Sequence, residues 1–77
     1  MVQAYILVQT EVGMAQDVSS AVAKIDGVVR VDMVTGPYDV VVLTEAATVD
    51  QLGAFVVSRV QRVQGITRTL TCSILEL

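Results

Sequence analysis

Five consecutive residues of this 77-residue sequence carry the side chains best suited to holding a polar ligand: Thr35-Gly36-Pro37-Tyr38-Asp39. Gly36 lets the backbone adopt a positive φ or approach a ligand closely, and Pro37 stiffens the turn. Tyr38 offers an amphipathic ring, and Asp39 places a hydrogen-bond acceptor directly before an aliphatic run. A carboxylate in such surroundings must be hydrogen-bonded or paired. Asp39 therefore either caps backbone amides of a tight turn or accepts hydrogen bonds from a ligand.

A second set of polar groups recurs at every other residue near the C-terminus. Because side chains alternate between the two faces of a strand, these hydroxyls share one face. These residues either favour strand formation on a partly solvent-exposed edge strand, or they form a row that lines a polar ligand site at an interface. The residues are Thr67, Thr69, Thr71 and Ser73.

The chain lacks most of the residues on which catalysis, metal binding and nucleic-acid binding usually depend. Histidine is absent, so the commonest general base and metal ligand is missing. Cys72 is the single cysteine, which precludes an internal disulfide and a CxxC site. Five basic residues and a net charge of −3 form no patch for a phosphate backbone. We therefore expect no enzyme activity, no cofactor, no metal and no direct contact with nucleic acid.

The elements that position these groups follow from hydrophobic periodicity. Apolar residues at i, i+4, i+7 and i+8 predict a helix over 14–25 that ends at Asp26-Gly27. A second helix begins at a capping box, Thr48 to Gln51, and ends at Gly65. Strands are predicted over 2–10, 28–35, 38–45 and 66–75. The predicted order is therefore βαββαβ.

Individual side chains are assigned to faces by the same periodicity. The second helix is expected to pack Leu52, Phe55, Val56, Val60 and Val63 inward and to expose Arg59 and Arg62. The strand over 28–35 alternates Val29, Val31 and Met33 with Arg30 and Asp32, which suits a sheet edge. The run 40–43 is apolar on both faces and suggests a central strand. Cys72 is expected to pack in the core.

The two halves of the chain resemble each other. Residues 25–31 match residues 63–69 in pattern at an offset of 38, at which Val18 also falls on Val56 and Val2 on Val40. Helix-Gly-strand junctions look alike in many α+β proteins, so this match alone does not prove a repeat. Together with the element order it predicts a ferredoxin-like α+β domain over 1–77, with a four-stranded antiparallel sheet and both helices on one face.

The sheet face away from the helices is also expected to be buried. Hydrophobic residues make up 53% of the chain and charged residues only 17%, and the runs 5–8 and 40–43 are apolar on both faces. We expect a second copy to cover the open face by sheet-to-sheet dimerisation. The sequence contains no apolar run of about 18 residues that would span a bilayer. It also lacks the pattern of a secretory signal, which predicts a cytoplasmic location.

These features resemble the effector-binding domain of the Lrp/AsnC transcriptional regulators, the RAM domain ("regulation of amino acid metabolism"). The likeness spans the whole chain. It is sharpest in the turn Thr35-Gly36-x-Tyr38-Asp39 with its following valines, and in Gly65-Ile66-Thr67-Arg68-Thr69. The resemblance implies dimers that gather into octameric or decameric rings, with amino-acid effectors between dimers. By position it implies a ligand site made of Gly36, Tyr38, Asp39, Thr69, Thr71 and Ser73.

Full-length members of that family carry an N-terminal helix-turn-helix domain, which this sequence does not contain. The resemblance therefore implies a stand-alone amino-acid-sensing and oligomerisation domain linked to transcriptional regulation. One alternative is a ligand-free partner that joins full-length regulators in mixed assemblies. Another is a small dimeric α+β-barrel enzyme, which the absence of histidine disfavours. An RNA-recognition module would require aromatic and basic residues that residues 38–43 largely lack.

Overall fold

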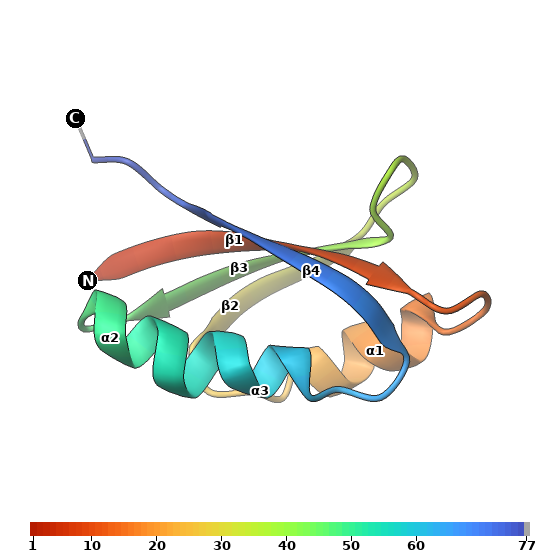
Figure 1. Cartoon of the computed structure of the whole chain (residues 1–77), viewed down its shortest axis with the longest axis horizontal. Coiled ribbons are helices and arrows are strands. Elements are labelled where there is room, and N and C mark those ends of the chain that lie inside the picture. Colours follow the sequence, from red (N-terminus) through yellow and green to blue (C-terminus); the bar gives the residue numbers. More distant parts are fainter. Residues whose placement is uncertain (77) are drawn as a thin grey trace.

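Four antiparallel strands and two helical stretches form two layers in the computed structural model, which describes residues 1–76 (Figure 1). Both helical stretches lie on the same face of the sheet (Figure 1). The elements in chain order are β1 (Val2–Thr10), α1 (Ala15–Val22), β2 (Val28–Met33), β3 (Val40–Ala46), α2 (Val49–Gln51), η1 (Leu52–Val57), α3 (Ser58–Gln61) and β4 (Ile66–Ser73).

The strand order across the sheet is β2-β3-β1-β4, and every neighbouring pair is antiparallel. β1 and β3 are the central strands, whereas β2 and β4 form the edges. This arrangement confirms the predicted ferredoxin-like βαββαβ fold. It also separates the two strands of each half, because β3 lies between β2 and β1, and β1 lies between β3 and β4.

The core lies between the sheet and the helices. Alternate residues of β1 and β3 face the helices and are fully buried, as the two-residue period of a strand requires. Among residues 1–76, Thr44 is the one buried polar residue, and its hydroxyl donates to the carbonyl of Ala4 at 2.8 Å. The buried apolar residues are Ala4, Ile6, Val8, Val18, Val22, Val40, Val42, Leu52, Val56 and Val60.

The internal repeat has a structural counterpart. Gly27 approaches Val56 of the second helix, and Gly65 approaches Val18 of the first, so the offset of 38 relates both pairs. The amide of Glu45 donates to the carbonyl of Gly27 and the amide of Glu11 to that of Gly65, each at 2.8 Å. In these two bonds Glu11 of the first half corresponds to Glu45 of the second half, an offset of 34 residues rather than 38, because the second helical stretch is longer. The predicted equivalence of Val2 and Val40 is therefore wrong.

Element ends differ from the predictions by a few residues. α1 ends at Val22 rather than at residue 25, because the amide of Ile25 bonds to the carbonyl of Val22 and tightens the chain into a turn. Gly27 still has the expected positive φ, +94°. The strands on either side of the Gly36 turn are shorter than predicted, ending at Met33 and starting at Val40. At the second helix, Thr48 accepts from the amide of Gln51 at 3.1 Å, as the capping box predicted.

Phe55 is 56% exposed, so its predicted place in the core is wrong. The cause is a π-helical segment, η1, in which the amide of Ser58 bonds to the carbonyl of Gly53 five residues earlier. A helix with this wider turn does not follow the 3.6-residue period on which the prediction rested. Leu52, Val56 and Val60 are buried as predicted.

A β-bulge in β2 changes the face assigned to Val29. The register passes from Val28 opposite Thr44 to Arg30 opposite Leu43, so Val29 is the extra residue and is 51% exposed. Val28 and Val31 pack against the core instead. Cys72 was also misplaced by the prediction: it pairs with Tyr5 on the face away from the helices and is exposed.

Candidate functional site

The turn between β2 and β3 is fastened to the end of β1. The amide of Asp39 donates to the carbonyl of Val8 at 2.9 Å, and the amide of Thr10 donates to the Asp39 carboxylate at 2.8 Å. The hydroxyl of Thr10 lies 3.4 Å from the same carboxylate oxygen, Oδ2. Asp39 therefore holds a backbone amide, which leaves its Oδ1 without a hydrogen bond among residues 1–76.

Gln9 provides a further link between β1 and this turn. Its Nε2 donates to the carbonyl of Pro37 at 2.8 Å. Neither Gln9 nor Thr10 was predicted from the sequence, because they lie 28 and 29 residues from their partners and no local pattern marks them. Gly36 is exposed with φ +147°, whereas Tyr38 is partly buried. The backbone of the turn is therefore accessible near Gly36, and hydrogen bonds of Pro37 and Asp39 hold the turn to β1.

The hydroxyls of β4 lie on the helix side of the sheet. Thr69, Thr71 and Ser73 pair with Val8, Ile6 and Ala4, all of which face the core. Thr69 is partly buried and accepts from Nε2 of Gln61 at 3.2 Å. Thr71 and Ser73 are exposed, because the edge strand extends beyond the cover of the helices.

A single chain does not gather the six predicted site residues into one place. Asp39 and Thr69 flank Val8 from opposite sides, about 10 Å apart at two strand spacings. Ser73 lies opposite Ala4, four residues or roughly 13 Å further along β1. The turn residues Gly36, Tyr38 and Asp39 therefore form one group, and the hydroxyls form another.

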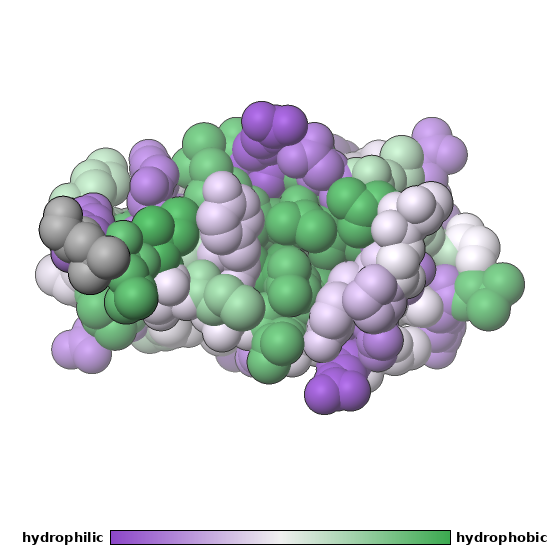
Figure 2. All heavy atoms as spheres, turned by 90° about the horizontal axis from the view of Figure 1, so that it is seen from above, coloured by the Kyte–Doolittle hydropathy of each residue, from purple (hydrophilic) through white to green (hydrophobic). Residues whose placement is uncertain are grey.

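The sheet face opposite the helices is open and largely apolar. Figure 2 shows hydrophobic side chains gathered across the centre of this face, with polar ones toward its margins. Tyr5 and Leu70 are 43% and 44% exposed there. Leu7, Val41 and Leu43 are only partly covered. We call this surface, made of Tyr5, Leu7, Val41, Leu43, Leu70 and Cys72, the open face.

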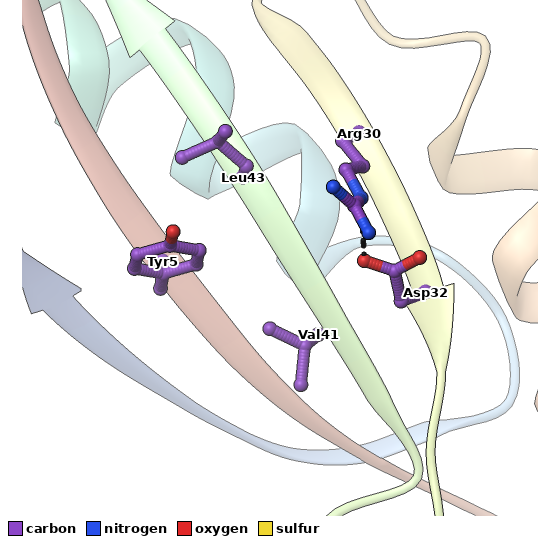
Figure 3. Close-up of a pocket in the computed structure, with 5 residues that line it drawn as sticks. All are labelled: Tyr5, Arg30, Asp32, Val41 and Leu43. Carbon is purple, nitrogen blue, oxygen red and sulfur yellow. Dashed lines mark hydrogen bonds and ion pairs between the residues drawn. The ribbon is translucent and has the colours of Figure 1, made fainter.

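A shallow hollow of about 220 Å³ lies on the open face (Figure 3). Tyr5 of β1 and Val41 and Leu43 of β3 form its apolar side, and Arg30 and Asp32 of β2 form its polar side. Nε of Arg30 lies 2.8 Å from Oδ2 of Asp32. Both charged side chains are substantially exposed, so this ion pair adds little to the stability of a single chain.

Residues 1–76 contain no cluster of His, Cys, Asp or Glu that could hold a metal ion. Within the same residues, no helix has the length and apolar character needed to cross a membrane.

Comparisons with known proteins agree with this architecture. A family model described as the Lrp/AsnC ligand binding domain matches residues 3–77. An uncharacterized HTH-type transcriptional regulator of Pyrococcus furiosus is 32% identical over 60 residues, which cover 77% of this chain and 40% of the regulator. This chain therefore spans less than half the length of that relative.

Solved structures show the same fold. A crystal structure of a protein from Thermus thermophilus superposes with a TM-score of 0.90 at 30% identity, covering 100% of this chain and 96% of the other. A transcriptional regulator from Neisseria meningitidis, solved in complex with L-Met, superposes with a TM-score of 0.82 at 19% identity, covering 97% of this chain and 50% of that protein.

Proposed function

Because this chain belongs to the Lrp/AsnC ligand-binding-domain family, we propose that it binds a free amino acid and couples that binding to the assembly of its copies. The matched family binds ligands and its relatives are transcriptional regulators, which sets the chain apart from enzymes. The observation that carries the proposal is the turn fastened by Asp39 to Thr10, where one carboxylate oxygen accepts from Thr10 and the other has no hydrogen bond among residues 1–76.

The chemistry of the turn suits an amino acid. The ammonium group requires an acceptor, which Oδ1 of Asp39 provides, and the carboxylate requires donors, which the exposed backbone near Gly36 and the β4 hydroxyls provide. Tyr38 borders the space for the side chain. The L-Met complex of the regulator from N. meningitidis, which has the same fold, supports an amino acid as the ligand class.

The site is completed by a second copy. In one chain the turn and the hydroxyls of Thr71 and Ser73 are separated, so a ligand that touches both groups must lie between copies. The apolar open face supports sheet-to-sheet dimers as the first step of assembly, because burying it removes exposed Tyr5 and Leu70 from water. Residues 1–77 then act as one ligand-binding and oligomerisation domain, with dimers assembling into octameric or decameric rings.

The proposed output is control of genes of amino acid metabolism from the cytoplasm. This output passes through helix-turn-helix regulators such as the two Pyrococcus relatives, whose matched segments are 32% and 28% identical to this chain.

Calorimetry with each of the twenty amino acids tests the proposal. At least one should bind, and Asp39→Asn should weaken that binding at least tenfold, because the variant loses the charge but keeps an oxygen for the amide of Thr10. Asp17→Asn, which makes the same charge change at an exposed site on α1, is the control and should bind normally. Absence of binding at millimolar concentrations of all twenty amino acids would refute the proposed function.

A further inference from the structure

Two arginines occupy equivalent positions in the repeat but have different surroundings. Arg30 and Arg68 are related by the offset of 38 residues. Arg30 is neutralised by Asp32 at 2.8 Å, whereas the residue equivalent to Asp32 in the second half is Leu70. Arg68 is exposed and makes no ion pair among residues 1–76. The second half of the repeat therefore presents a guanidinium without a counter-charge.

Arg68 lies beside the positions of β1 that hold the turn. In the β1–β4 register Arg68 is opposite Gln9, whose side chain donates to Pro37, and the next residue, Thr10, donates to Asp39. Gln9 follows the buried Val8, so Gln9 and Arg68 lie on the face away from the helices, at its end beyond the pair Leu7 and Leu70 of the open face. The loop between β2 and β3 rises from the sheet on that same side (Figure 1).

We propose that Arg68 binds the carboxylate of the amino acid whose ammonium binds to Asp39. The inference rests on the proposed function and names its second charged group. Asp39 and Arg68 lie on either side of β1, about 10 Å apart at the backbone, and the long arginine side chain shortens that gap. An acceptor and a cationic donor on the two sides of one strand match the two opposite charges of a zwitterion.

A guanidinium makes the site selective in a way that hydroxyls do not. It forms two parallel, charge-assisted hydrogen bonds with a carboxylate and cannot be deprotonated at physiological pH. A hydroxyl can donate to the oxygen of either a carboxylate or a carboxamide, and it carries no positive charge to pair with the carboxylate. Arg68 thus selects free amino acids over their amides and over amines that lack the carboxylate.

The test compares the best-binding amino acid with its carboxamide by calorimetry. The unmodified chain should bind the amino acid more tightly than the amide, and Arg68→Gln should weaken amino-acid binding about 10- to 100-fold while changing amide binding little. Arg59→Gln, which removes an exposed arginine from α3, is the matched control and should leave both affinities unchanged. Light scattering on each variant monitors the oligomer.

The outcomes separate this inference from the function on which it rests. If amino acids bind and Arg68→Gln keeps both the affinity and the preference over the amide, Arg68 does not bind the carboxylate but amino-acid sensing stands. If Arg68→Gln changes the oligomer mass and leaves affinity intact, the arginine belongs to a contact between copies, which also overturns the inference. If no amino acid binds to the unmodified chain, the proposed function itself fails.

Discussion

Replacement of Gly27 by alanine measures how tightly the two halves of the fold are joined. The added Cβ would lie 2.5 Å from Cγ2 of Val56 and 3.0 Å from the carbonyl oxygen of Glu45, with φ at +94°. A residue with a Cβ costs about 1–2 kcal/mol in the left-handed region. Forcing a methyl group into a packed site costs about 1–3 kcal/mol more. Gly27→Ala should therefore lower the free energy of unfolding by roughly 2–5 kcal/mol.

A loss of that size is large for this chain. At about 0.05–0.15 kcal/mol per residue, a domain of this length has a free energy of unfolding of roughly 4–12 kcal/mol. Each kcal/mol corresponds to about 4–8 °C, so the Tm of Gly27→Ala should fall by roughly 8–40 °C. The assay is thermal and urea unfolding followed by circular dichroism at one protein concentration, because assembly would otherwise shift the Tm.

Two other glycines separate the backbone cost from the steric cost. Gly13 has φ +80° with nothing within 4 Å of its Cβ position, so Gly13→Ala should show only the backbone cost of about 1–2 kcal/mol. Gly53, in the helical stretch, also has open space, and Gly53→Ala should be neutral or stabilise by up to about 1 kcal/mol. If Gly27→Ala and Gly13→Ala were equally destabilised, the contact with Val56 would not restrain the fold.

Two further substitutions test the open face and the helix cap. Leu70→Asp places a charge on the open face and should raise the dissociation constant of the dimer, measured by analytical ultracentrifugation, roughly 100-fold. The control Phe55→Asp changes an exposed residue of η1 and should leave the dissociation constant unchanged. Equal effects of the two variants would show that the open face is not the interface. Thr48→Ala removes the cap on the amide of Gln51 and should cost about 1 kcal/mol in urea unfolding. Thr48→Ser keeps the hydroxyl and should restore most of that loss.

The fold was predictable because its signals are local or periodic. The buried positions Ile6, Val8, Val40 and Val42 follow the two-residue period of strands, and Gly27 marks the start of β2. Phe55 was misplaced because a π-helical turn depends on packing that no local period records. The bulge at Val29 likewise follows from pairing with β3, a partner distant in sequence.

The candidate site was only partly predictable from the sequence. The motif around Gly36 and Asp39 identified the turn, because its residue types are unusual together. Gln9 and Thr10, which hold the turn, carry no such mark, since only the sheet brings them to it. The sequence also could not show that Thr71 and Ser73 lie away from the turn, because their distance depends on the strand order.

The strand order has a consequence for how such a domain can diversify. Because each half pairs its strands with those of the other half, neither fragment can form a sheet alone, and the Thr35–Asp39 turn is the one covalent link between them. A chain cut within that turn should still reassemble from its two fragments. The strand pairing is thus specified largely outside this turn, so ligand preference can evolve at turn residues other than Asp39, which fastens the turn to β1.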